Sequence, residues 1–306
     1  MINRREFLKK TSAAAGAVSI SAFGAMSAGC CCTRAAEVKY PAYENNLRDR
    51  LWMWGHDPGA YDGPKGVYNI PLSAPLSMAE GIKNMGIPNV CVIRGGHPDE
   101  KYRSQFKDVK RIAWNLGSNQ KSYESLKDYV FGLRDIMPNM TGYYLDDFFH
   151  GKPKVETDPA PAALSQEQMK ELYEETLAYK RRLELAIVVY TSQIGPWIKP
   201  VMQYVDTVSL WIWNGSDIQK LEANFKKYRA LVPDKPTLLG IYMWDFGGKK
   251  ELSKDFMAMQ LDHAYKLYKE GQIDGLIFHC TPLGNKGLVA VDYARDWIAK
   301  HGNEGR

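Results

Sequence analysis

The sequence predicts a closed (β/α)8 barrel, the TIM-barrel architecture, as a single domain after a cleaved signal segment. Beyond residue 36 the chain repeats one pattern, in which a short apolar run is followed by a loop and an amphipathic helix. The eight apolar runs are almost continuously apolar, as expected of parallel strands covered on both sides. Eight such units in 270 residues match the usual length of a barrel, roughly 250 residues.

Each expected strand is rich in aromatic and β-branched residues, which favour strands. An open, doubly wound sheet is the alternative architecture. It would need a glycine-rich phosphate-binding turn after an early strand, and neither GxGxxG nor GxxxxGK[ST] occurs in the chain. We therefore expect one barrel over residues 37–306, with strands at 51–55, 89–93, 111–116, 141–146, 185–191, 207–213, 237–244 and 275–280.

Helices are expected between these strands, and three of them have a clear start signal. A Ser followed three residues later by Glu or Gln is typical of a capping box, in which the two residues satisfy backbone N–H groups at a helix N-terminus. The pattern occurs at Ser77-x-x-Glu80, Ser165-x-x-Gln168 and Ser216-x-x-Gln219. The second of these starts a helix expected over 165–183, and the last helix is expected over 286–300. The Pro- and Gly-rich segments 56–75 and 150–165 are expected to be long loops after strands.

Residues 1–36 are expected to be a signal peptide and a short tether, not part of the fold. The segment Arg4-Arg5-Glu6-Phe7-Leu8-Lys9 resembles a twin-arginine export signal and precedes a small, weakly apolar run. Ala28-Gly29-Cys30 resembles the end of a bacterial lipobox, in which the Cys is acylated after cleavage. Cleavage by an ordinary signal peptidase is the alternative. The resemblance implies an exported protein, periplasmic or at the cell surface, with Cys30 as the only membrane tether.

Charge and cysteine content exclude some classes of function. The formal net charge is +5, but residues after 29 contain 36 Lys and Arg against 34 Asp and Glu, without a long basic run. This balance does not indicate a nucleic-acid partner. Beyond the CCC cluster only Cys91 and Cys280 remain, both inside apolar runs, so they are expected to be buried thiols without a disulfide.

Two adjacent carboxylates end the fourth expected strand, and they are the first candidates for catalysis. Active sites of these barrels lie at the carboxyl ends of the strands, where Asp146 and Asp147 fall. Side chains alternate along a strand, so Tyr144 and Asp146 face the barrel axis while Tyr143 faces the helices. Asp245 ends the seventh strand and is the other candidate. Each could instead hold a loop, Asp147 as a loop cap and Asp245 as a turn residue.

Aromatic and hydrogen-bonding side chains follow the other strand ends. Apolar ring faces of sugars stack on indoles, and sugar hydroxyls bond to carboxylates and amides, so such a ring of residues suits a carbohydrate. Barrel packing is the alternative for the Trp residues, and structural hydrogen bonding for the His residues. The expected substrate-binding residues are Trp54, His56, Asp57, Arg94, Asn115, Tyr144, Trp213, Asn214, Tyr242, Trp244 and His279.

This arrangement resembles the barrel glycoside hydrolases in general. The resemblance implies hydrolysis of a glycosidic bond in an oligo- or polysaccharide by two carboxylates, without a cofactor or metal. Asp146 is then the central catalytic carboxylate and Asp245 or Asp147 its partner. The sequence departs from enzymes that place Glu on strands 4 and 7, because none of its Glu residues lies at a strand's carboxyl end.

Two other functions remain open at this stage. One is metal-dependent hydrolysis, with His56, Asp57, Asp146 and His279 as ligands. The other is a glycan-binding lipoprotein without catalytic activity, in which the aromatic residues stack on sugars and no pair of carboxylates catalyses hydrolysis.

Overall fold

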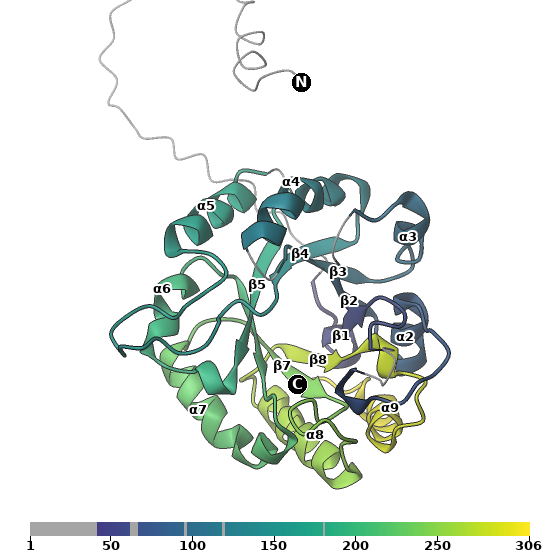
Figure 1. Ribbon diagram of the computed structural model, residues 1–306. Helices are drawn as coiled ribbons and strands as arrows, with labels where there is room; N and C mark the ends of the chain where they lie inside the picture. The colour runs from purple at the N-terminus through teal and green to yellow at the C-terminus, as the bar shows by residue number, and fades with distance from the viewer. Residues whose placement is uncertain (1–41, 62–66, 95–96, 118–119, 180) are drawn as a thin grey trace, which may run out of the picture. The chain divides into compact units, whose positions relative to one another are not determined.

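The computed structural model describes residues 42–306 apart from 62–66, 95–96, 118–119 and 180, so the expected signal segment lies outside it. Eight parallel strands pair in chain order, and β8 pairs with β1 to close a barrel (Figure 1). The predicted architecture is confirmed. The strands are β1 (Leu51–His56), β2 (Asn89–Ile93), β3 (Arg111–Asn115), β4 (Met140–Leu145), β5 (Glu184–Tyr190), β6 (Thr207–Trp211), β7 (Thr237–Tyr242) and β8 (Gly275–His279).

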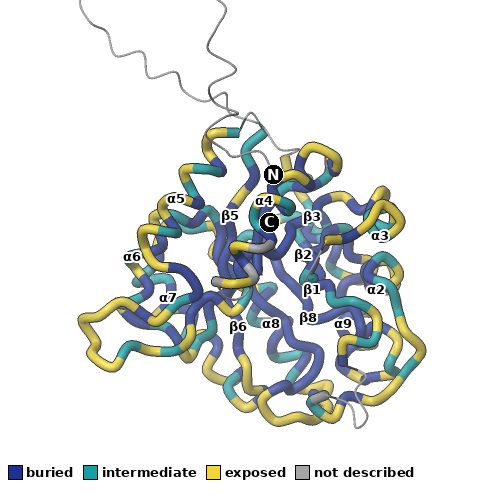
Figure 2. The backbone as a smooth tube through the Cα atoms, turned by 45° about the horizontal axis from the view of Figure 1, so that its top comes forward, coloured by how far each residue is buried: buried dark blue, intermediate teal, exposed yellow. Residues whose placement is uncertain are grey.

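Helices surround the barrel, and their outer faces are exposed while the strands are buried (Figure 2). Within the described parts of the chain, no helix is long and apolar enough to cross a membrane. The α-helices are α2 (Met78–Met85), α3 (Glu100–Ser104), α4 (Gln120–Ile136), α5 (Gln166–Leu177), α6 (Lys199–Met202), α7 (Leu221–Leu231), α8 (Lys254–Lys269) and α9 (Val289–His301). The 3-10 helices are η1 (Arg48–Arg50), η2 (Val67–Asn69), η3 (Thr191–Gln193), η4 (Pro196–Ile198), η5 (Gly215–Lys220) and η6 (Thr281–Leu283).

Two of the three expected capping boxes are present, at Ser77 in front of α2 and at Ser165 in front of α5. The third prediction, at Ser216, is wrong. Residues 215–220 form the 3-10 helix η5 with Asn214 as N-cap and no side-chain cap, and α7 begins only at Leu221. The prediction of a helix over 165–183 was too long, because α5 ends at Leu177. Cys91 and Cys280 are buried free thiols, as expected.

Three large rings fill the barrel interior. The ring of Trp54 meets Tyr144 and Trp211 edge to face, with centroids 5.3 and 5.4 Å apart. Gly240 on β7 makes room for the indole, because a Cβ at this position would lie 2.1 Å from Cδ2 of Trp211. Tyr143, one residue from Tyr144, instead packs against Phe131 of α4. The alternation expected along β4 is therefore confirmed.

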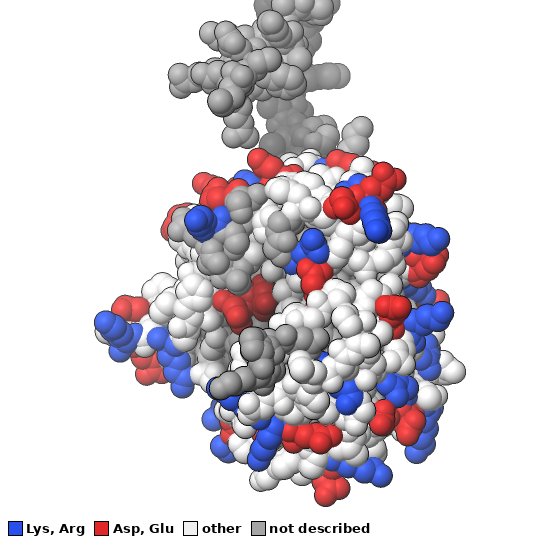
Figure 3. Space-filling view, turned by 45° about the vertical axis from the view of Figure 1, so that its right-hand side comes forward, with Lys and Arg blue, Asp and Glu red and all other residues white. Residues whose placement is uncertain are grey.

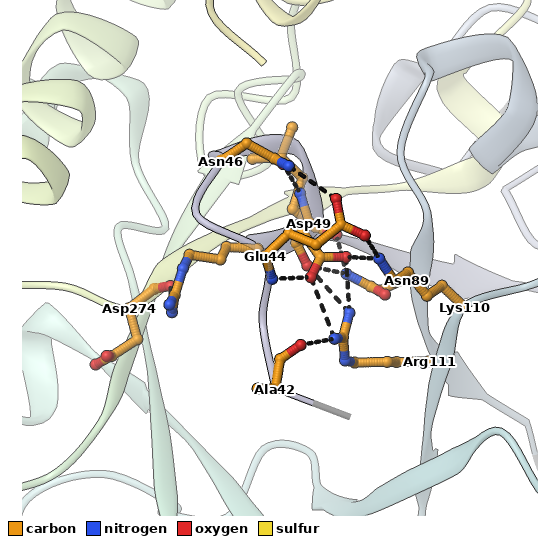
Figure 4. A network of polar contacts seen from close by, with 10 residues as sticks. Ala42, Glu44, Asn46, Asp49, Asn89, Lys110, Arg111 and Asp274 are labelled. Atoms are coloured by element: carbon orange, nitrogen blue, oxygen red, sulfur yellow. Dashed lines mark hydrogen bonds and ion pairs between the residues drawn. The ribbon is translucent and has the colours of Figure 1, made fainter. Parts of the chain in front are cut away.

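A buried ion-pair network lies at the amino-terminal ends of the strands, opposite the end where barrel active sites are found (Figure 4). Asp49 of η1 accepts hydrogen bonds from Arg111 at the start of β3, with Nη1–Oδ1 2.9 Å and Nη2–Oδ2 3.2 Å. Both side chains are only 2% exposed. Lys110 adds a contact to Asp49 Oδ1 at 2.6 Å, and the Glu44 N–H donates to Asp49 Oδ2 at 2.7 Å. Thus the network connects η1 to β3.

Candidate active site

A cavity of about 150 Å³ opens where the carboxyl ends of the strands meet. Figure 3 shows acidic side chains gathered in a hollow, with uncharged surface along part of its edge. The cavity contains two carboxylates, two imidazoles and a large aromatic surface. Its lining residues are Trp54, His56, Tyr61, Tyr68, Asp146, Asp147, Val188, Tyr190, Trp211, Trp213, Tyr242, Phe246 and His279.

Asp146 and Asp147 directly follow β4, and the backbone fixes how they lie. The Asp147 N–H donates to Asp146 Oδ1 at 2.9 Å, and the Asp146 N–H donates to Asn115 Oδ1 at 3.4 Å. Asp147 has φ of 46°, a left-handed conformation that few residues other than Gly adopt. Tyr190 at the end of β5 donates its phenolic hydrogen to Asp147 Oδ1 at 2.9 Å. A sharp turn thus places both carboxylates at the cavity, and such strained turns cluster at functional sites.

The carboxyl group of Asp146 holds its proton more strongly than an ordinary aspartate. Burial, and to a lesser degree the charge of Asp147, raises the pKa of Asp146 from 3.8 to about 7. The hydrogen bond from the Asp147 N–H acts in the opposite direction but is outweighed. Near neutral pH, Asp146 can therefore act as a proton donor beside a second carboxylate.

The two histidines of the cavity are uncharged at neutral pH. Burial lowers the pKa of His56 to about 4, although the charge of Asp57 acts to raise it. Burial, together with the neighbouring His56, lowers the pKa of His279 well below its usual range. His279 is 8% exposed, and its Nδ1 atom has no hydrogen-bond partner. A buried, unpaired nitrogen in the wall of a cavity suits a polar group of a ligand.

Several expected substrate-binding residues do line this cavity: Trp54, His56, Trp213, Tyr242 and His279. Others lie outside its lining. Arg94 Nη1 donates to both oxygens of Asp57 at 2.9 Å, and the Tyr102 hydroxyl donates to Asp57 Oδ1 at 2.6 Å. Asp57, which the metal hypothesis requires, is therefore held by two other side chains. Among the residues described, no group of three or more His, Cys, Asp or Glu side chains is placed to hold a metal ion.

Asp245, expected as the partner of Asp146, does not line the cavity. Its Oδ1 accepts hydrogen bonds from the N–H groups of Gly215 at 3.0 Å and Gly248 at 2.8 Å, and the residue is 7% exposed. A Cβ at Gly248 would lie 2.4 Å from Asp245 Oδ2, so the loop can approach this carboxylate only with Gly there. Asp245 therefore connects two loops. Asp147 remains as the candidate for the second carboxylate beside Asp146.

Four further expected residues surround the cavity without lining it. Trp244 is buried, and its Nε1 donates to the carbonyl of Tyr68 at 3.2 Å, which holds the loop after β1 in place. Asn115 accepts the N–H of Asp146, as noted above. Tyr144 lies below Trp54 in the barrel. Asn214 lines a second cavity next to the first.

Sequence reasoning missed six lining residues: Tyr61, Tyr68, Val188, Tyr190, Trp211 and Phe246. Trp211 lies two residues before Trp213 on the same run, so the alternation of side chains along a strand could have placed it on the same side. No comparable signal exists for Tyr61 and Tyr68, which come from the long loop after β1. Their rings lie 6.2 Å apart and contact Phe246 at 5.8 and 5.3 Å, so loop and strand end form one aromatic wall.

Comparison with known proteins supports the fold. No protein-family model matches the chain, and no curated protein matches it in sequence. Among solved structures, a candidate alpha-L-fucosidase from Bacteroides thetaiotaomicron VPI-5482 has a TM-score of 0.56 at 12% identity, covering 84% of this chain and 96% of that one. The GH99 endo-alpha-mannosidase from B. thetaiotaomicron has a TM-score of 0.52 at 11% identity, covering 82% and 97%.

A GH2 beta-galacturonidase from Eisenbergiella tayi bound to galacturonate is also similar, with a TM-score of 0.51 at 12% identity. The match covers 86% of this chain but only 52% of the galacturonidase. These three neighbours carry the names of enzymes that cleave glycosidic bonds. At this level of identity the likeness establishes the architecture alone.

Proposed function

We propose that the protein is a glycoside hydrolase. The observation that carries the proposal is the Asp146–Asp147 pair at the edge of an aromatic cavity, with Asp146 protonated near neutral pH. Glycosidic bonds are cleaved by carboxyl groups that include one acid of raised pKa. Aromatic rings around the pair suit the apolar faces of a sugar, and the barrel of this chain is of the type seen in glycoside hydrolases.

The two carboxylates have different roles in this proposal. Asp146 donates its proton to the oxygen of the leaving group as the bond between that oxygen and the anomeric carbon breaks. The Asp147 carboxylate accepts a hydrogen bond from Tyr190, and its negative charge stabilises the positive charge that develops on the sugar ring. Water then adds to the anomeric carbon, and its proton returns to Asp146.

The charges of the cavity favour a neutral sugar. The described lining contains two carboxylates, two uncharged imidazoles and several tyrosines, but no Lys or Arg. A uronic acid would bring its own carboxylate close to Asp147, and like charges repel each other. We therefore propose neutral glycans as the substrate class.

A pH profile tests the role of Asp146. A panel of 4-methylumbelliferyl glycosides, with neutral sugars and uronides, identifies a substrate. For that substrate kcat/KM should fall as the pH rises through about 7, because deprotonated Asp146 has no proton to donate. Asp147→Asn should move this fall to lower pH, since one of the two causes of the raised pKa is removed and burial remains.

The matched control for this experiment is Asp292→Asn on α9, which makes the same charge change at an exposed residue paired with Arg295. It should leave the profile in place. A panel without any hydrolysis would contradict the proposed function. A profile that Asp147→Asn leaves unmoved would contradict the assignment of Asp146 as the acid.

We also propose that the protein is exported through its twin-arginine signal, and that residues 1–36 are removed or serve as a tether. The support is the Arg4-Arg5 pair in front of the small apolar run. Replacing both residues with Lys should leave the precursor in the cytoplasm, as measured by fractionation and immunoblotting. Unchanged export would show that another signal is used. Mass spectrometry of the mature N-terminus separates an acylated Cys30 from ordinary cleavage.

A further inference from the structure

A second cavity, of about 330 Å³, lies directly beside the first. The two cavities share Asp147, Tyr190 and Trp213, so they meet at Asp147. The rings of Tyr190 and Trp213 lie 6.0 Å apart, and both are part of the boundary. The residues that line the second cavity alone are Thr191, Ser192, Asn214 and Asp217.

The first cavity has room for little more than one ring. A cavity of about 150 Å³ in another protein accepts one benzene molecule, and this one has a similar volume. Its floor is closed by the packing of Trp54 on Tyr144 and Trp211. Tyr61, Tyr68 and Phe246 form its aromatic wall, described above. A sugar ring inside it would have its scissile bond beside Asp146 and Asp147, where the second cavity begins.

The second cavity combines an apolar ring with fixed polar groups. Trp213 is 36% exposed, so its indole is available to a ligand. Asn214 Nδ2 donates to Asp217 Oδ2 at 3.1 Å, and Lys220 Nζ donates to Asp217 Oδ1 at 2.8 Å. These contacts, the one from Lys220 first, lower the pKa of Asp217, so it stays ionised and can accept bonds from hydroxyl groups. An exposed aromatic ring beside pre-positioned acceptors suits a second sugar.

From this geometry we infer that the protein removes single terminal sugars from an oligosaccharide. The terminal ring occupies the first cavity, and the sugar of the leaving group occupies the second cavity, on Trp213, Asn214 and Asp217. This inference rests on the proposed function. It adds the direction in which the substrate lies across the site, toward β5 and β6, and a binding site for the sugar of the leaving group.

The test compares two substrates of the sugar that the panel identifies. A glycosyl fluoride has no sugar in its leaving group, whereas a disaccharide with the same terminal sugar fills both cavities. The double variant Asn214→Ala, Asp217→Ala should lower kcat/KM for the disaccharide about tenfold or more, since two hydrogen-bonding side chains are lost. It should leave kcat/KM for the fluoride within about twofold, because these residues do not line the first cavity.

Asp292→Asn is again the control and should alter neither substrate. The first products from a tetrasaccharide labelled at its reducing end should be one free sugar and a labelled trisaccharide. Equal losses on fluoride and disaccharide, no loss on either, or initial cleavage within the tetrasaccharide would overturn the inference while leaving a glycoside hydrolase. No hydrolysis of the fluoride or of any panel glycoside by the wild type would instead overturn the proposed function itself.

Discussion

Asp146→Asn is expected to lower kcat for the cleaved glycoside by a factor of about 10³ or more. The amide preserves the size of the side chain but has no acidic proton for the leaving group, and general acid catalysis contributes about 10²–10⁴-fold. The effect should be large because the proposal assigns Asp147, the other carboxylate of the cavity, to charge stabilisation and leaves no second proton donor. Steady-state kinetics on a glycoside with a poor leaving group measures the loss.

The same substitution should make the folded protein more stable at alkaline pH. The pKa of Asp146 is raised from 3.8 to about 7, so the folded state binds this proton more tightly than the unfolded chain. Stability therefore falls as the pH rises from about 4 to about 7, and above this range the charged carboxylate destabilises the folded protein. Asp146→Asn removes that cost. Urea unfolding at pH 8 should show a stabilised variant, with the difference vanishing near pH 4.

Together these two measurements separate a catalytic role from a structural one. Loss of turnover with a stabilised fold and retained glycan binding would support the proposed role of Asp146. Near-normal turnover on the same glycoside would make the carboxylate pair structural. Retained glycan binding without turnover in the wild type would instead favour the third hypothesis, a glycan-binding protein without catalysis.

Asp49→Asn is expected to destabilise the barrel by about 3–5 kcal/mol, the usual cost of removing one partner of a buried ion pair. Asp49 and Arg111 are each 2% exposed, so the variant would leave the guanidinium charge buried without its carboxylate. The free energy of unfolding, measured with urea at pH 7, is the readout. Glu44→Gln is the control, because Glu44 is 62% exposed where it contacts Lys110, and exposed ion pairs contribute about 0–1 kcal/mol.

The wild-type network also predicts a response to acid. Burial acts to raise the pKa of Asp49, but hydrogen bonds from Arg111 and Lys110 outweigh it and lower the pKa to about 2. The stability that Asp49 contributes is therefore present above pH 4 and is lost as the pH falls from about 4 to about 2. In the Asp49→Asn variant, this part of the fall in the free energy of unfolding at low pH should be missing. If Asp49→Asn and Glu44→Gln cost the same, the burial of the pair has no energetic consequence.

The barrel could be predicted from the sequence because its signals are local. Apolar runs mark the strands, and alternation along the run from 141 to 146 places Asp146 at the cavity. The role of Asp245 could not be predicted in this way. In the sequence it follows an apolar run, as Asp146 and Asp147 do. Gly215, thirty residues earlier in the chain, reaches its carboxylate only through the packing of two loops. The same applies to Asp57, which Arg94 and Tyr102 hold from other parts of the chain.

The position of Trp211 has a consequence for how this site can evolve. Its ring is 2% exposed, packs against Trp54 within the barrel and also lines the cavity. A smaller residue there would deepen the cavity but leave a void in the core, and such losses typically cost about 3–5 kcal/mol for a large aromatic ring. Asn214, in the loop after β6, is exposed, so replacing it leaves no such void. Descendants of this protein should therefore acquire new sugar preferences by replacing loop residues, while the floor of the cavity stays the same.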